Sequence, residues 1–210
     1  MTARNVAVRL AAVVVALVVL AGCASTTPVQ PVGEPSADRR PTATTGDGDL
    51  VERRRAAGID DCPASDPEVA AHPEGLPDLT LDCLGGDSQV RLAGLRGEPM
   101  LINVWAQWCG PCRTEAPFLA EAAQARPDVQ VLGIDFDDPE PAAAVDFAGQ
   151  AGWGWPQVVD PDKRIAPEMR VIGPPQSFLV DAEGRIVHVH VGPFTSTEQV
   201  LETLDRHLPQ

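Results

Sequence analysis

Two cysteines three residues apart, Cys109 and Cys112, are the residues whose type and spacing most directly suggest chemistry in this chain. A thiolate is the nucleophile of thiol–disulfide exchange, and a second cysteine at this spacing can close a disulfide with the first. The apolar run 100–105 predicts a buried strand, and a helical pattern begins beyond Trp108. We therefore expect Cys109 at the exposed start of a helix, where free N–H groups and the helix dipole favour its thiolate, and Cys112 one turn further in.

The residues around the pair distinguish a redox site from a zinc site. Zinc usually needs a second ligand pair, and the sequence has no other Cys-x-x-Cys and no His-x3–5-His. Gly110 allows a close turn, and Pro111 suits an early helical position where a missing N–H costs little. Trp-Cys-Gly-Pro-Cys, followed by Pro117 inside the expected helix, resembles the thioredoxin active site. We expect Trp108, with Gly110 and Pro111, to shape the surface that meets a substrate.

The patterns on either side of the motif indicate one α/β domain over residues 61–210. Its last helix begins at a Thr195-x-x-Glu198 capping box. The expected elements are a β-hairpin at 76–91, a strand at 100–105, a helix at 110–126, a strand at 129–134, a helix at 142–151, a strand at 157–159, a short helix ending near 169, a second hairpin within 172–191 and a helix at 195–208.

From about Leu76 to the end, this order resembles the TlpA/ResA-like branch of the thioredoxin superfamily. The resemblance implies a thioredoxin-like α/β fold, with a central mixed β-sheet flanked by helices and an N-terminal β-hairpin extension. In that family the proline of a Gly-x-Pro sequence is cis and lies across from the cysteine pair, and Pro175 matches it. Pro174, before it, can offer its carbonyl to an extended substrate. Pro174 has no N–H, however, so one backbone donor of the family pattern is missing here.

The same resemblance suggests which residue handles the proton. Thioredoxin proper keeps a buried aspartate six residues before the first cysteine, where this chain has Asn103, and an amide cannot take a proton. The TlpA/ResA branch carries a glutamate three residues after the second cysteine, and Glu115 stands there. Residues i and i+3 share a helix face, so Glu115 is predicted to relay a proton for Cys112. Alternatively, Glu115 is only an acidic residue that is favourable near a helix N-terminus.

The N-terminal region predicts export and membrane attachment. Residues 1–22 hold two arginines and then an apolar run at 10–20, which is typical of a secretory signal and short for a membrane span of about 20 residues. The sequence Leu-Ala-Gly-Cys ending at Cys23 resembles a bacterial lipobox, which implies a lipid anchor on Cys23 and a domain on the extracytoplasmic side of the cell membrane. The alternative is an uncleaved anchor helix. Residues 23–60 are rich in Pro, Thr and Gly and predict a disordered tether.

The other cysteines and the histidine pair have two interpretations each. In an exported protein, Cys62 and Cys83 are expected to form a structural disulfide, and the alternative is a second redox pair. His188 and His190 lie two apart on a strand and face the same way, as copper or zinc ligands could. No third ligand is evident, so we expect solvated positions on an edge strand and no metal site.

The leading hypothesis is therefore a membrane-tethered thiol–disulfide oxidoreductase that needs no dissolved cofactor. A formal net charge of −14 argues against nucleic acid as a partner. The Gly-Pro pair between the cysteines is that of thioredoxin, a strong reductant at about −270 mV, which favours a reductase of exported proteins supplied by a transmembrane thiol carrier. By resemblance, apocytochrome c and copper-site cysteines are candidate clients. The alternatives are a disulfide-forming oxidase and a copper metallochaperone binding through Cys109, Cys112 and a histidine.

Overall fold

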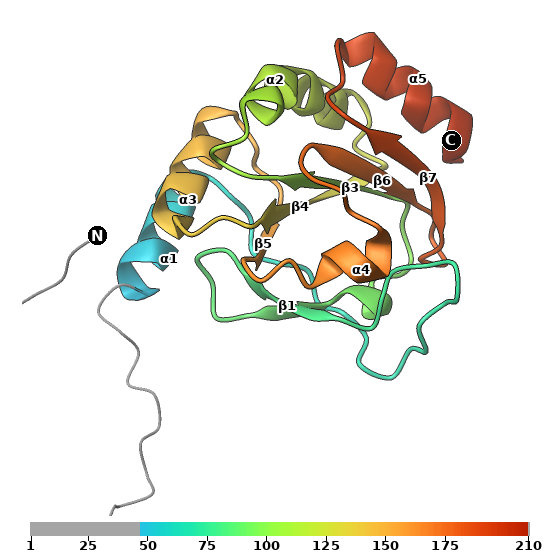
Figure 1. The fold of residues 1–210 in the computed structure, drawn as a ribbon, viewed down its shortest axis with the longest axis horizontal. Helices are drawn as coiled ribbons and strands as arrows, with labels where there is room; N and C mark the ends of the chain where they lie inside the picture. The colour runs from blue at the N-terminus through green and yellow to red at the C-terminus, as the bar shows by residue number, and fades with distance from the viewer. Residues whose placement is uncertain (1–46, 210) are drawn as a thin grey trace, which may run out of the picture. The chain divides into compact units, whose positions relative to one another are not determined.

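A seven-stranded mixed sheet forms the centre of the fold in the computed structural model, which describes residues 47–209 (Figure 1). The strand order is β2-β1-β5-β4-β3-β6-β7. The strands are β1 Thr80–Cys83, β2 Gln89–Arg91, β3 Met100–Trp105, β4 Gln130–Phe136, β5 Gln157–Asp160, β6 Gln176–Val180 and β7 Ile186–Val191. The helices are α1 Asp47–Ala56, the 3-10 turn η1 Leu92–Gly94, α2 Gly110–Ala125, α3 Pro141–Gln150, α4 Ile165–Met169 and α5 Thr197–His207. This confirms the thioredoxin-like α/β fold with an N-terminal hairpin.

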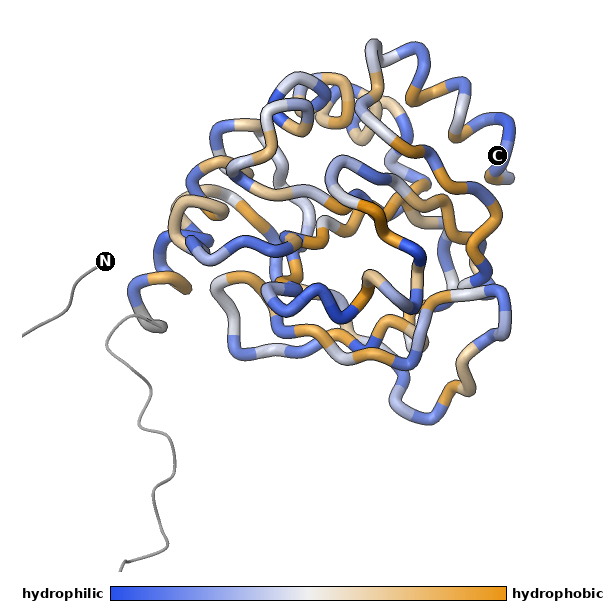
Figure 2. The backbone as a smooth tube through the Cα atoms, viewed as in Figure 1, coloured by the Kyte–Doolittle hydropathy of each residue, from blue (hydrophilic) through white to orange (hydrophobic). Residues whose placement is uncertain are grey.

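Two apolar layers hold the helices on the sheet. On one face, Leu101 and Trp105 of β3 pack in a core shared with α1, α2, α3 and α5. On the other face, Ile102 and Val104 pack with α4 and with residues of the β1–β2 hairpin. All six residues of β3 are buried, which explains why its sequence is apolar on both faces, except at Asn103, rather than alternating. Figure 2 shows the hydrophobic residues gathered along the strands, whereas the helices alternate in character.

The sheet register places three connecting segments at the same end of the central strands. β3 runs parallel to β4, with Trp105 opposite Asp135, and antiparallel to β6, with Val104 opposite Gln176. The loop that leaves β3, the loop that leaves β4 and the segment that enters β6 therefore meet at the same end of these strands. The first of these loops carries Cys109, and the last segment carries Pro175. The architecture thus brings together segments far apart in the sequence.

The disordered tether was predicted to extend to residue 60, but residues Asp47–Ala56 form helix α1. Its buried Arg54 donates to the carbonyls of Gly85 (2.9 Å) and Ile59 (3.1 Å). Leu50 also packs against the core beside α3. The helix is very polar, so its sequence alone does not predict docking; it is held by these tertiary contacts. The folded domain therefore begins before residue 61.

Two further expectations concern the ends of the chain. Helix α5 is capped by Ser196, whose Oγ accepts the N–H of Gln199 (3.2 Å), rather than by the predicted Thr195. Within the part of the chain that the structure describes, no helix has the length and hydrophobicity needed to cross a bilayer. The predicted signal at 1–22, Cys23 and the rest of the predicted tether up to residue 46 lie outside the described residues.

Candidate active site

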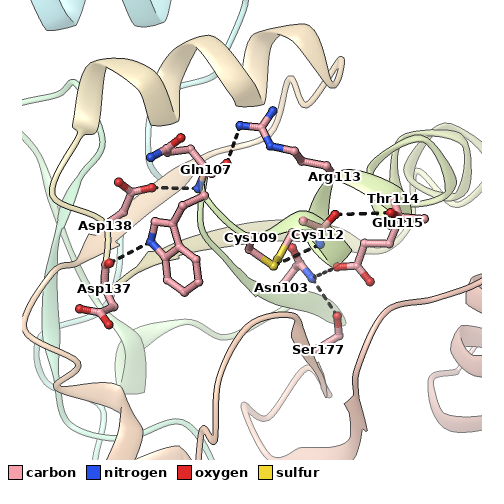
Figure 3. Close-up of a disulfide and its surroundings, with 12 residues drawn as sticks. Asn103, Gln107, Cys109, Cys112, Arg113, Thr114, Glu115, Asp137, Asp138 and Ser177 are labelled. Carbon is pink, nitrogen blue, oxygen red and sulfur yellow. Dashed lines mark hydrogen bonds between the residues drawn. A yellow bond between two sulfur atoms is a disulfide. The ribbon is translucent and has the colours of Figure 1, made fainter.

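Cys109 and Cys112 form a disulfide at the start of α2 (Figure 3). Cys109 is the N-cap residue of this helix, and its Sγ accepts the N–H of Cys112 (3.2 Å). Gly110 and Pro111 occupy the first two helical positions, where proline loses no intrahelical hydrogen bond. After reduction, a Cys109 thiolate in this position would keep an N–H donor and the positive end of the helix dipole. The local geometry therefore favours Cys109 as the nucleophile.

The exposure of the pair differs from the expectation that Cys109 sits at an open helix start. Cys109 is only 3% exposed and Cys112 is fully buried. Trp108 is the prominent surface residue instead, with 50% of its area exposed. The capping contact explains the difference, since the Cys109 sulfur is directed at the helix that it caps. A substrate would therefore meet Trp108 together with a small part of Cys109.

The loop that leaves β4 holds the active-site loop in place. Asp138 Oδ2 accepts the N–H of Gln107 (2.8 Å), and the Asp137 carbonyl accepts Trp108 Nε1–H (3.0 Å). From the helix side, Arg113 donates to the Gln107 carbonyl (2.5 Å). Figure 3 shows these contacts around the disulfide. The sequence analysis did not predict these contacts. The acidic residues at 135–138, at the end of β4 and just after it, could have indicated them.

Glu115 is completely buried one turn beyond Cys112. Its Oε1 accepts from Asn103 Nδ2 (3.0 Å), and its Oε2 accepts the N–H of Phe194 (2.9 Å). Burial raises the pKa of Glu115 from its ordinary 4.5 to about 7, and the hydrogen bonds from Phe194 and Asn103 oppose this increase. A carboxyl with such a pKa is present in both protonation states at neutral pH, which suits proton exchange with a buried thiol.

Asn103 connects this carboxyl to the next strand. Its Nδ2 also donates to Ser177 Oγ of β6 (3.0 Å), while its Oδ1 is buried without a hydrogen-bond partner. A side-chain amide has a donor end and an acceptor end, and rotation about its last torsion exchanges them. Asn103 could therefore donate to an ionised Glu115 and accept from a protonated one. The sequence indicated only that Asn103 cannot carry the proton itself.

The proline pair lies at the same end of the sheet as the disulfide. The peptide bond between Pro174 and Pro175 is cis, and Pro175 directly precedes β6. The Pro175 carbonyl accepts the N–H of Gly192 (3.1 Å). Just upstream, Ile172 is 81% exposed, an apolar side chain that sequence analysis did not single out. The segment that enters β6 thus presents an exposed apolar side chain at Ile172 and lacks a backbone N–H at position 174.

The second cysteine pair lies in a different part of the sheet. Cys62 and Cys83 are joined by a disulfide, and Cys83 pairs across the ladder with Val158 of β5, not with β3. Cys83 is the last residue of β1. The bridge therefore links the segment after α1 to the first hairpin, and neither sulfur caps a helix in the way that Cys109 does.

The histidines pack rather than project freely into solvent. The His188 ring stacks on that of His207, and the His190 ring stacks on Phe194, with 4.0 Å between the ring centroids in each case. Burial lowers the pKa of both strand histidines. Among residues 47–209, no three His, Cys, Asp or Glu side chains are grouped closely enough to hold a metal ion.

Three comparisons relate this chain to known proteins. A family model described as Redoxin matches residues 72–204, a range that contains Cys109, Cys112, Glu115 and Pro175. A thiol:disulfide interchange protein of Paracoccus denitrificans, a DsbE homolog, is 37% identical over 59% of this chain and 63% of its own length. The thiol-disulfide oxidoreductase ResA of Bacillus thuringiensis is 29% identical over 63% of this chain and 73% of its own. A structure of a secreted thiol-disulfide isomerase from Corynebacterium glutamicum aligns with a TM-score of 0.54 and 25% identity, covering 69% of this chain and 94% of that one. The chain thus spans less than two thirds of the Paracoccus relative.

Proposed function

Because the chain belongs to the Redoxin family, we propose that it is a thiol–disulfide oxidoreductase whose Cys109–Cys112 couple exchanges electrons with exported proteins. The observation that carries this proposal is the position of the pair at the start of α2, where the Cys109 sulfur caps the helix. The names of the relatives, thiol:disulfide interchange protein and thiol-disulfide oxidoreductase, support the same reaction class. No dissolved cofactor takes part in this chemistry.

The first step is attack by the reduced Cys109 thiolate on a substrate disulfide. A new Cys109–substrate disulfide forms, and the other substrate sulfur leaves as a thiolate. Trp108 and the segment around Pro174 and Pro175 would contact the substrate chain. Because Pro174 has no N–H, main-chain pairing with a substrate has one donor fewer, and apolar contact with Trp108 and Ile172 has a correspondingly larger share in recognition.

In the second step the Cys112 thiol loses its proton to Glu115, and the resulting thiolate attacks Cys109 Sγ. The mixed disulfide breaks, and the substrate leaves with both sulfurs reduced. The two electrons come from the Cys109–Cys112 dithiol, which becomes the disulfide. The buried carboxyl is suited to this role because its pKa of about 7 lets it accept and later release a proton near neutral pH. A transmembrane thiol carrier would return the couple to the dithiol.

The direction and the setting of the reaction belong to the same proposal. The Gly110–Pro111 pair favours a reductase, with apocytochrome c or copper-site cysteines as candidate clients, and a disulfide-forming oxidase is the second candidate. Cys23 would carry lipid and hold the domain at the extracytoplasmic face of the cell membrane. The Cys62–Cys83 bridge would remain closed during turnover. Determination of the Cys109–Cys112 potential decides the direction, since a value near about −270 mV fits a reductase and one near about −120 mV fits an oxidase.

A trapping experiment tests the reaction itself. In Cys112→Ser the first step proceeds but the second cannot, so a covalent complex with an exported client should accumulate. In Cys109→Ser no such complex should form. With dithiothreitol as the electron source, reduction of insulin by the wild-type chain should be catalytic, and it should be abolished in both variants. Stoichiometric Cu(I) binding without insulin turnover would instead support a metallochaperone.

A further inference from the structure

Two further carboxyl groups, those of Asp135 and Asp138, lie at the end of β4 and in the loop that follows it. Neither has a role in the mechanism above. Asp135 is a buried residue of β4, directly opposite Trp105 of β3, and its Oδ1 has no hydrogen-bond partner. Asp138, also buried, lies in the loop that supports the active site. Its Oδ2 accepts the N–H of Gln107 (2.8 Å), and its Oδ1 accepts the N–H of Glu140 (3.0 Å). Both Asp138 oxygens are therefore bound to backbone N–H groups, one of them only two residues before Cys109.

The Asp135 carboxyl is hydrogen-bonded to that of Asp138, three residues further along the chain. Burial is the main cause that raises the pKa of Asp135 from 3.8 to about 9, and the charge of Asp138 and a hydrogen bond to it raise it further. At neutral pH Asp135 thus holds a proton that it can donate to Asp138. Other charged groups on the neighbouring elements are bound elsewhere: Lys163 to Asp137, Arg113 to the Gln107 carbonyl, and Asp160 to the first N–H groups of α4.

We propose that the Asp135–Asp138 carboxyl pair is a positioning element for the disulfide. Asp138 holds the backbone N–H of Gln107, and Asp135 holds Asp138 through the proton between the two carboxyls. Gln107 and Trp108 are the residues that lead from β3 to the helix cap, so their placement determines how Cys109 meets a substrate sulfur. Loss of the shared proton would leave two adjacent buried carboxylates, whose repulsion would move Asp138 and release the Gln107 amide. The inference rests on the proposed exchange reaction for its consequence, although the contact itself can be tested without it.

The contact is tested by NMR, through the pH dependence of the backbone N–H resonance of Gln107. The full, oxidised chain is used, because its cysteines do not titrate. In the wild type this resonance should shift with a midpoint near pH 9, separate from the titration of Glu115 near pH 7. Asp135→Asn keeps an N–H donor toward Asp138 at every pH, so the transition near pH 9 should disappear while the neutral-pH resonance is retained. A wild-type Gln107 resonance that is constant from pH 8 to 10 would overturn the proposal.

The consequence is tested by insulin reduction at pH 7. Asp138→Ala should lower kcat/KM by about tenfold and displace the Gln107 resonance, whereas Asp135→Asn should reduce insulin at close to the wild-type rate. Asp138→Asn, which keeps one acceptor, serves if the alanine variant does not fold, and should fall between the two. Asp128→Asn, an equal charge change in an exposed ion pair with Arg126, is the matched control. A displaced Gln107 resonance with unchanged kcat/KM would refute the positioning role. Wild-type protein that reduces no insulin would refute the proposed function and leave the Gln107 titration as the test of the pair.

Discussion

Replacing Glu115 by Gln should slow the chemistry and at the same time stabilise the fold at alkaline pH. A glutamine side chain at position 115 cannot take the Cys112 proton, so resolution of the mixed disulfide should slow by about 10²-fold. The packing should survive, because Asn103 can rotate its unpartnered Oδ1 toward the new amide, while the N–H of Phe194 keeps an oxygen to donate to. A residue that served only the helix dipole would show no such kinetic effect.

The stability change follows from the pKa of Glu115. A carboxyl whose pKa rises from 4.5 to about 7 on folding binds its proton more tightly in the folded state. The free energy of unfolding therefore decreases as pH rises from 4.5 to 7 and is unaffected by this group at higher pH. A shift of this size corresponds to about 3 kcal/mol, since one pKa unit is worth roughly 1.4 kcal/mol. The Glu115→Gln variant has no such penalty, so its free energy of unfolding relative to wild type should rise by about 3 kcal/mol between pH 4 and pH 8.

Two assays on the same proteins check both effects. Single-turnover decay of a Cys109 mixed disulfide measures the resolving step from pH 6 to 9, and urea unfolding of the oxidised chain at pH 4 and pH 8 measures stability. Glu121→Gln is the matched control, because Glu121 is an exposed residue of the same helix that binds Thr197. Wild-type resolution rates in Glu115→Gln across that pH range would refute the proton-transfer role. If the stability difference between Glu115→Gln and wild type were the same at pH 4 and at pH 8, the raised pKa of Glu115 in the folded state would be refuted.

Three other changes test the rest of the chain. Cys23→Ser should release the protein from the membrane fraction without unfolding it, and an unmodified, uncleaved N-terminus in a mass spectrum would contradict the anchor. Gentle reduction followed by alkylation should label Cys109 first and spare Cys62 and Cys83; replacing both of the latter by Ser should cost about 3 kcal/mol of stability for a sequence separation of 21, as measured by urea unfolding. Arg54→Leu leaves two buried carbonyls unsatisfied and should cost about 2–3 kcal/mol and expose α1 to proteolysis, while the exposed neighbour Arg55→Leu should not.

The sequence predicted the elements of the domain because each has a local signal. Three of these signals depend only on neighbours in the sequence: the largely apolar run of β3, the glycine-rich turn of the first hairpin and the Cys-Gly-Pro-Cys helix start. Helix α1 has no such signal, since Arg54 finds its partners at Gly85 and Ile59 only after the chain has folded. The capping error at α5 has a local cause, since Ser196 and Thr195 are adjacent residues that can both cap a helix.

The residues of the candidate site also differ in how far the sequence could predict them. Spacing along one helix, together with the family resemblance, predicted a proton relay from Cys112 to Glu115, and the burial of Glu115 is consistent with it. Contacts between loops were not visible, because Asp138 and Gln107 are 31 residues apart and meet only through the register of β3 with β4. Asp135 lies just beyond the end of the predicted strand at 129–134, where the sequence pattern gives no reason to expect a buried residue. Position 135 is buried because β4 continues to Phe136 and stays paired there, with β3 on one side and β5 on the other.

The amide at position 103 offers Glu115 a hydrogen-bond partner in both of its protonation states. When Glu115 is ionised, both of its oxygens accept N–H groups, from Asn103 and Phe194. When it is protonated, the new O–H needs an acceptor, and an unpaired buried donor would cost about 1–3 kcal/mol. Rotation of Asn103 supplies that acceptor, and Ser177, whose hydroxyl can donate as well as accept, adjusts to the rotated amide. The rotation also moves Nδ2 to the place where Oδ1 has no partner, so it has a cost of the same order. An aspartate at position 103 would instead place a second buried carboxyl against Glu115 and separate their pKa values. Position 103 is thus suited to support a proton carrier on α2 because it cannot carry the proton itself.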